Sequence, residues 1–266
     1  MKTDCLSLRN VSKSYHAGIR GCSATVTVLR DVDLNVFAGE IVAIAAAPSA
    51  GKTTLLMCAA GLIRPDRGAV SWFGGPPRRD GSGKPEGIAY AGDRPFPYGF
   101  LTTREALEYA AIVRDLPLRD SARRVACAMD RTRLSAVADR RVDALNGSDL
   151  ARLSVAGGLL SEPRLLLIDD IGSGCDPAVA EELVRLLHVV ATEGAGVVVS
   201  GDLVQWFAPA IAAQPRADVR FLSLDSGRLK AIDPARPAVR MHPGSRSHAR
   251  VAELPHGAAP RQNGGR

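Results

Sequence analysis

Residues 41–54 of the 266-residue chain read IVAIAAAPSAGKTT. The run opens with five apolar residues, which is typical of a strand buried on both faces inside a parallel sheet. Gly51, Lys52 and Thr53 then supply three parts of a phosphate-binding loop: a small residue where backbone N–H groups converge, a lysine for the outer phosphates and a hydroxyl for Mg²⁺. We expect a helix from Gly51 to about Leu62, whose N-terminus faces the same anion.

One position departs from the strict spacing of such loops. The pattern Gly-x-x-x-x-Gly-Lys-Thr begins with a glycine, and this chain has Ala46 there. If the position requires a left-handed backbone, alanine costs about 1–2 kcal/mol, or roughly tenfold in affinity. We therefore expect a loop that is weakened and still binds.

Strand patterns lie on both sides of this loop. Residues 4–10 and 26–37 alternate apolar and polar positions, as half-buried strands do, and the small residues at 17–25 predict a loop between them. Residues 165–168 and 197–199 are continuous apolar runs, which predict two more buried strands.

Helical patterns separate these strands. Residues from about 95 to 160 are mainly helical in pattern and predict an inserted subdomain. Asp176 followed by Pro177 is a favoured start for another helix, and residues 221–232 predict a terminal hairpin. Strands that alternate with helices indicate an α/β fold with a mostly parallel core sheet.

The charge of the chain is unevenly distributed. The formal net charge is +6, and residues 233–266 hold six arginines against Asp233 and Glu253. This segment is also rich in proline and glycine, so it buries too little apolar surface to offset its ordering entropy. We expect residues 1–232 to be the folded domain and 233–266 to be a solvated, disordered basic tail. Contact of the tail with acidic lipid headgroups or RNA is the alternative.

Other classes of protein do not fit the composition. No stretch approaches the ~18 apolar residues of a membrane-crossing helix, and the first residues show no secretory signal, so we expect a soluble intracellular chain. The five cysteines are far apart and form no Cys-x-x-Cys pair. They predict buried reduced thiols and neither a metal site nor a disulfide framework.

Further motifs stand in a fixed order around the loop. They are VSKSY at 11–15, LRDV at 29–32, GLIRPDRG at 61–68, LTTREAL at 101–107, PRLLLIDD at 163–170 and GSGCDP at 172–177. In this order and spacing, residues 1–232 resemble the nucleotide-binding subunit of an ABC (ATP-binding cassette) transporter. The resemblance implies a P-loop NTPase fold with a mostly parallel core sheet, an antiparallel β subdomain and an inserted helical subdomain.

The resemblance also implies which residues bind ATP and Mg²⁺. Lys52 would hold the β- and γ-phosphates, Thr53 the Mg²⁺, and Thr54 the α-phosphate side of the loop. Asp169 would bind Mg²⁺ through water, and Asp176 would belong to a loop that reaches across a dimer. Tyr15 would stack on adenine, with core packing as the alternative. The nucleotide-binding residues implied are Tyr15, Ser49, Ala50, Gly51, Lys52, Thr53 and Thr54.

Four positions differ from the family pattern. Asp93 stands where the family has a glutamine that senses Mg²⁺ and the attacking water. Asp170 stands at the position of the catalytic glutamate and is one methylene shorter. The histidine expected after the third buried strand is missing, because Ser200 runs into Gly201.

The fourth difference is the signature motif Leu-Ser-Gly-Gly-Gln, which here reads LNGSD at 145–149. Asn146 keeps a donor for the γ-phosphate and Gly147 is unchanged. Ser148 adds a side chain where backbone must come close, and Asp149 brings a carboxylate towards phosphate.

These residues lead to one expected function and two alternatives. We expect an ATP-binding subunit that binds Mg-ATP at a dimer interface, hydrolyses it slowly, and serves a separate transmembrane permease from the inner face of the membrane. A heterodimer with a complete cassette is favoured over a homodimer, and no specific nucleic acid is expected. An exposed aromatic patch at 95–100 suits the permease contact, with packing beneath the helical subdomain as the alternative. The other functions considered are a non-hydrolysing regulatory or assembly cassette and a DNA-repair or translation cassette.

Overall fold

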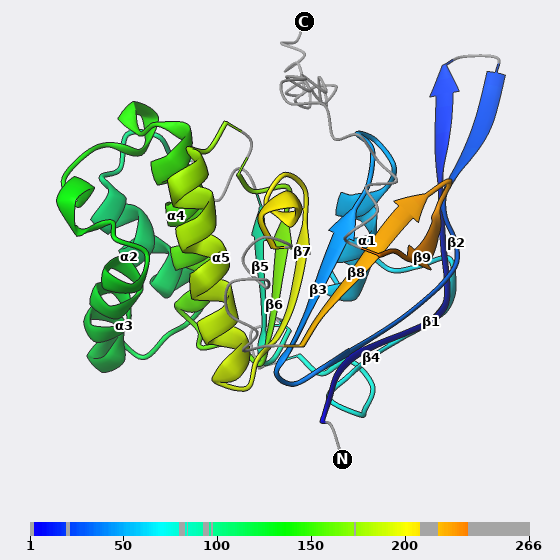
Figure 1. Ribbon diagram of the computed structural model, residues 1–266, viewed down its shortest axis with the longest axis horizontal. Helices are drawn as coiled ribbons and strands as arrows, with labels where there is room; N and C mark the ends of the chain where they lie inside the picture. The colour runs from blue at the N-terminus through cyan, green and yellow to red at the C-terminus, as the bar shows by residue number, and fades with distance from the viewer. Residues whose placement is uncertain are drawn as a thin grey trace, which may run out of the picture.

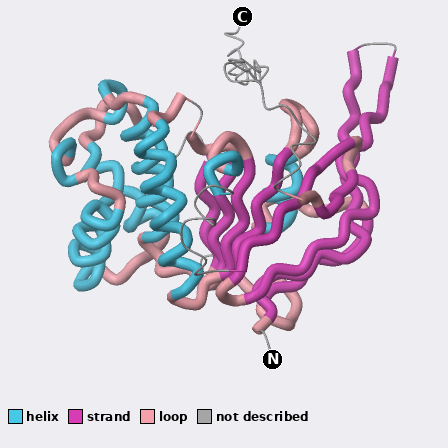
Figure 2. Tube along the Cα trace, viewed as in Figure 1, coloured by secondary structure: helices cyan, strands magenta, loops and turns pink. Residues whose placement is uncertain are grey.

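The computed structural model describes residues 3–19, 22–79, 83, 85–92, 96, 98–172, 174–207 and 218–233. Within these residues the strands form two sheets, and most of the helices lie on the opposite side of the larger sheet from the smaller one (Figure 1). Figure 2 shows the same separation of helix from strand along the chain trace. No helix within the described residues combines the length and hydropathy needed to cross a bilayer.

The larger sheet carries the phosphate-binding loop. Its strand order is β5-β6-β7-β3-β8-β9, and every neighbouring pair is parallel except β8 with β9. The predicted mostly parallel core sheet is therefore confirmed. Its strands are β3 (Glu40–Ala45), β5 (Ile88–Gly92), β6 (Leu165–Asp169), β7 (Gly196–Ser200), β8 (Asp218–Asp225) and β9 (Arg228–Ala231).

The smaller sheet is antiparallel, with the order β2-β1-β4. Its strands are β1 (Asp4–Ile19), β2 (Cys22–Phe37) and β4 (Arg67–Trp72). The predicted loop at 17–25 is wrong, because the two strands stay paired up to Ile19 opposite Cys22. Small residues are poor strand formers, but each still has a backbone donor and acceptor to place in the ladder.

The two faces of the larger sheet are covered differently. One face packs on α4 (Gly147–Leu159) and α5 (Pro177–Thr192), with Val155, Leu183 and Leu187 in that core. The other face packs on α1 (Lys52–Ala59) and on the smaller sheet, with Leu55 and Leu29 in the core between them. Helix α1 is therefore held between the two sheets, so the loop before it has rigid support on both sides.

Helix α1 ends earlier than the sequence predicts. Gly61 has φ +67°, its N–H donates to Cys58 O, and the N–H of Leu62 donates to Met57 O. This pair of hydrogen bonds is a Schellman motif, which ends a helix at a left-handed glycine. The glycine itself is the stop signal, ahead of Pro65.

The predicted helical insertion lies between β5 and β6. It contains α2 (Thr103–Val113), α3 (Leu118–Arg131), two 3₁₀ turns (Ser135–Val137 and Val142–Ala144) and α4. It has its own core, which includes Leu107, Met129, Leu134 and Leu153. The limits of about 95–160 remain a prediction, and residues 234–266 of the expected tail lie outside the described residues.

The cysteines are only partly buried. Cys5 and Cys58 are buried as expected, Cys175 is half-buried and Cys127 is exposed. Cys127 lies on α3, which has a strongly polar outer face, so its position on that face decides its exposure. The expectation of buried thiols is wrong for Cys127.

Candidate functional site

The loop between β3 and α1 has two left-handed residues. They are Ser49 (φ +62°) and Gly51 (φ +101°), and Ala46 is not among the positive-φ residues. Alanine at position 46 is expected to weaken the loop only if that position has a left-handed backbone, and it does not have one. Gly51 has a second reason to be glycine, because a Cβ there would lie 2.6 Å from Val28 Cγ1. Ala46 directly follows β3, and without a positive φ an L-residue with a Cβ is unstrained there.

Lys52 begins α1 and is 9% exposed. Its ammonium donates to Ala46 O and Ala47 O, both at 3.3 Å from Nζ. The Lys52 ammonium therefore lies against the loop that precedes α1. An anion bound by the backbone N–H groups of this loop would also contact the ammonium.

Tyr15 lies on β1 beside the first turn of α1. Its side chain is 43% exposed, and its hydroxyl is 3.4 Å from Thr54 Oγ1. Core packing, the alternative given for this residue, is wrong at this exposure. The free ring beside the loop is available for stacking, and Lys13 Nζ lies 5.8 Å from its centroid.

Asp169 ends β6 and is 4% exposed. Each of its carboxylate oxygens accepts one hydrogen bond from a hydroxyl: Tyr90 donates to Oδ2 at 2.7 Å and Ser200 donates to Oδ1 at 2.9 Å. Sequence reasoning missed both donors. The sequence did offer one indication of them: Tyr90 and Ser200 each carry a hydroxyl and lie near the end of a strand that neighbours β6.

Asp170 follows in a left-handed conformation, with φ +54°. Its backbone N–H donates to Ser200 Oγ at 3.3 Å, so Ser200 contacts both aspartates. Gly201, where the sequence predicts the family's histidine to be missing, has φ +90° and faces Asp170: a Cβ built there would lie 2.6 Å from Asp170 Cα.

A cavity of about 390 Å³ lies beside Thr53, Asp169 and Asp170, whereas Lys52 and Tyr15 are not among its described lining residues. Thr53 and Asp169 both line it, so the two predicted Mg²⁺ ligands face one space, and Asp170 lines it as well. Asp93 lies outside the described residues, although its neighbour Gly92 is part of the lining. The remaining lining residues are Met57, Tyr90, Ala91, Phe96, Arg114, Ser154 and Gly157.

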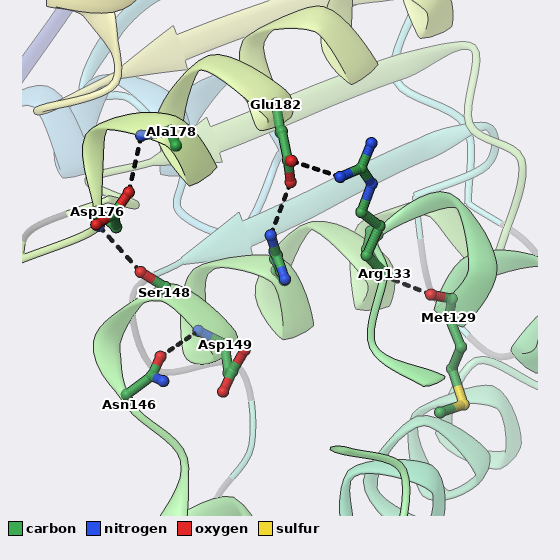
Figure 3. Close-up of polar contacts among 10 residues, drawn as sticks. Met129, Arg133, Asn146, Ser148, Asp149, Asp176, Ala178 and Glu182 are labelled. Atoms are coloured by element: carbon green, nitrogen blue, oxygen red, sulfur yellow. Dashed lines mark hydrogen bonds and ion pairs between the residues drawn. The ribbon is translucent and has the colours of Figure 1, made fainter. Parts of the chain in front are cut away.

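The predicted signature residues form the N-terminus of α4, as Figure 3 shows. Asn146 is the N-cap residue, and its Oδ1 accepts from the Asp149 N–H at 2.8 Å. Gly147 is the first helical residue, and Asp149 is 8% exposed in the first turn, where a carboxylate stabilises the helix N-terminus. Ser148 Oγ accepts the Asp176 N–H at 2.9 Å. Among the described lining residues of the cavity there is none from this motif.

Asp176 is the N-cap residue of α5, and its Oδ1 accepts the Ala178 N–H at 2.8 Å (Figure 3). The predicted cap with Pro177 behind it is confirmed. Further along α5, Glu182 accepts from Arg133 at 2.5 Å and from Arg152 at 2.7 Å. The helical insertion therefore contacts α5 at its N-cap residue Asp176 and, within the helix, at Glu182.

Comparison with known proteins identifies the family. Residues 29–172 match the family model described as ABC transporter. The chain is similar to the pyoverdine export ATP-binding/permease protein PvdT of Pseudomonas savastanoi pv. phaseolicola, with 31% identity over 201 residues that cover 73% of this chain and 30% of that protein. It is also similar to the lipopolysaccharide export system ATP-binding protein LptB of Acidithiobacillus ferridurans, with 28% identity over 74% of this chain and 80% of LptB.

A solved structure of an ATP-binding subunit of an ABC transporter superposes with a TM-score of 0.65 at 27% identity, covering 86% of this chain and 90% of that one. The chain spans about a third of the length of the PvdT proteins, which carry a permease part as well by name. The motif order, the two-sheet fold and the family match agree. This chain belongs to the ABC transporter ATP-binding cassette family.

Proposed function

We propose that this chain binds Mg-ATP and acts as the ATP-binding subunit of an ABC transporter. The observation that carries the proposal is the cavity of about 390 Å³, which is lined by Thr53 on α1, the helix after β3, and by Asp169 and Asp170 at the end of β6. Ligands of open α/β sheets bind outside the carboxyl ends of the strands, which is where this cavity lies.

The residues present fit a magnesium nucleotide. A hydroxyl from Thr53 and a carboxylate from Asp169 are oxygen ligands of the kind that Mg²⁺ prefers, and Lys52 with the loop N–H groups would hold the phosphates. When bound, Mg²⁺ would neutralise part of the phosphate charge. Ser49, Ala50, Gly51 and Thr54 would complete the loop around the anion, and Tyr15 would contact the base.

We further propose that hydrolysis is slow. Asp170 is shorter than the family's glutamate, and its left-handed backbone sets the direction of its side chain. Gly201 offers no side chain at the position of the family's histidine. A general base contributes about 10²–10⁴-fold, so losing its placement lowers turnover much more than binding. The second candidate function is a non-hydrolysing regulatory cassette. Asp170 and Gly201 favour it for the same reason that they favour slow hydrolysis.

The partners proposed are a second cassette and a separate permease. Because the cavity lining described here includes no residue of 145–149, a second subunit would have to supply a signature motif. A heterodimer would pair the loop of this chain with a complete signature.

Of the aromatic residues predicted for the permease contact, Tyr98 and Phe100 are 41% and 62% exposed, whereas Phe96 packs inward. The inner face of the membrane and the absence of a nucleic-acid partner remain part of this proposal.

The test is nucleotide binding by the full chain. Millimolar ATP with Mg²⁺ should raise the melting temperature, since a ligand at 100 times its Kd adds about 2.7 kcal/mol to stability. Lys52→Ala should lose the increase, and Lys230→Ala, which alters an exposed lysine on β9, should keep it. Phosphate release would then separate slow hydrolysis from none. An unchanged melting temperature in the wild-type chain would refute the proposal.

A further inference from the structure

The Asp169 carboxylate is held by neutral donors alone in its two observed hydrogen bonds. It is 4% exposed, and a carboxylate removed from water in this way requires hydrogen-bond donors. Tyr90 and Ser200 supply one donor to each oxygen, at 2.7 Å and 2.9 Å. Two bonds to separate oxygens fix the rotation of the carboxylate plane as well as its position.

The two donors come from opposite sides of Asp169. Strand β5 carries Tyr90 and strand β7 ends at Ser200, and these are the two neighbours of β6 in the sheet. Tyr90 faces the cavity, whereas Ser200 is completely buried. The carboxylate is therefore clamped from both flanks by strands that are themselves fixed by parallel pairing.

The hydrogen bonds from Tyr90 and Ser200 leave lone pairs of the Asp169 carboxylate available on the side of the cavity. An ionised carboxylate has about four lone-pair sites, and the two hydroxyls use one on each oxygen. Asp169 and Thr53 line the same cavity, so the remaining sites are available on the side of the predicted metal. Groups that orient a ligating carboxylate typically change metal affinity by about 10–100-fold when they are removed.

We propose that Tyr90 and Ser200 are positioning residues that set the Mg²⁺ affinity of the nucleotide site through Asp169. This inference rests on the proposed binding of Mg-ATP. Ser200 has a second role, because its Oγ also accepts the Asp170 N–H. Ser200 therefore affects the placement of Asp170 as well as the metal.

The experiment is a Mg²⁺ titration of a fluorescent ATP analogue bound to the full chain, with a parallel measurement in EDTA. Tyr90→Phe and Ser200→Ala should each raise the Mg²⁺ concentration at half-effect by about tenfold, at the lower end of the range for such groups. Affinity in EDTA should be unchanged, and Ser200→Thr should restore the wild-type value. Ser200→Ala should also alter phosphate release measured at saturating Mg²⁺, because it removes the acceptor of the Asp170 N–H.

Matched controls remove the same groups elsewhere. Tyr109→Phe deletes a tyrosine hydroxyl on α2, and Ser71→Ala deletes a serine hydroxyl on β4; both should keep the wild-type titration. A wild-type Mg²⁺ dependence in Tyr90→Phe would overturn the inference while leaving nucleotide binding in place. Equal loss of affinity with Mg²⁺ and in EDTA would also overturn it, because that is the effect of a packing defect. Failure of the wild-type chain to bind the analogue at all would instead refute the proposed function.

Discussion

Gly201 and Asp170 are in direct backbone contact, with room at 201 for a hydrogen and for nothing larger. A Cβ at 201 would lie 2.6 Å from Asp170 Cα, closer than real Cβ atoms approach. Both residues are left-handed, at φ +90° and +54°. A side chain at 201 would therefore collide with Asp170, so the present placement of Asp170 requires glycine at 201.

Any side chain introduced at 201 should therefore be unfavourable. We expect Gly201→His to release phosphate no faster than wild type. We expect Gly201→Ala to destabilise the chain by about 1–2 kcal/mol because of the left-handed backbone, and by about 1–3 kcal/mol more because its Cβ would collide with Asp170. Urea unfolding measures the loss. Gly194→Ala is the control, since Gly194 has φ +108° and nothing within 4 Å of its would-be Cβ. Equal losses in the two variants would show that contact with Asp170 plays no part.

The phosphate-binding loop should respond to glycine at Ser49 and not at Ala46. Ser49→Gly removes a left-handed L-residue, so we expect a net gain of about 0.5–1 kcal/mol after the added freedom of the unfolded chain is subtracted. Ala46→Gly adds that freedom without relieving strain and should lose about 0.5–1 kcal/mol. Urea unfolding of both variants tests the pair. A gain in Ala46→Gly would mean that the first position of the loop is strained after all.

The hydrogen bond from the Asp176 N–H to Ser148 Oγ should protect that amide from exchange. Ser148→Ala should increase hydrogen exchange at Asp176 and remove about 0.5–1.5 kcal/mol of stability. Asn146→Ala is a matched comparison, since it removes the cap on the Asp149 N–H, at about 1 kcal/mol, and should expose that amide instead. Unaltered exchange at Asp176 in Ser148→Ala would contradict the prediction.

The stability of the chain should fall in mild acid because of His188. The imidazole is 8% exposed, neither ring nitrogen has a hydrogen-bond partner among the described residues, and burial lowers its pKa below 6.5. The unfolded chain then binds the proton more tightly, so the stability is present above about pH 6.5 and is lost as the pH falls from there.

Urea midpoints of wild type and His188→Leu between pH 7.5 and 5 test this. Each pH unit in the affected range should remove up to roughly 1.4 kcal/mol from the wild type beyond the change in the variant, the limit for one extra proton. Parallel curves for wild type and His188→Leu would rule out His188 as the source.

Much of the fold could be predicted because apolar periodicity reports burial directly. The runs at 165–168 and 197–199 are strands in the structure, and Asp176 caps its helix as expected. The paired strands across 17–25 were missed because propensity describes side chains, while pairing there depends on backbone hydrogen bonds.

The site could be predicted only where its residues are local in sequence. Lys52 and Thr53 follow from the spacing of one loop, and Asp169 from the end of one strand. Tyr90 and Ser200 could not be found this way, because their role depends on which strands flank β6, and that order is set by contacts between distant segments. The conformation of Ala46, which directly follows β3, likewise could not be read from the motif pattern.

The place of β3 in the sheet has a consequence for synthesis of the chain. Within the described residues this strand pairs with β7 and β8, which are synthesised after it and end at Ser200 and Asp225. At roughly 5–20 residues per second, its apolar edges stay open on the ribosome for roughly ten to thirty seconds. Nascent chains stopped before residue 196 would carry an unpaired hydrophobic edge, a template for aggregation, and should depend on chaperones until the last strands emerge.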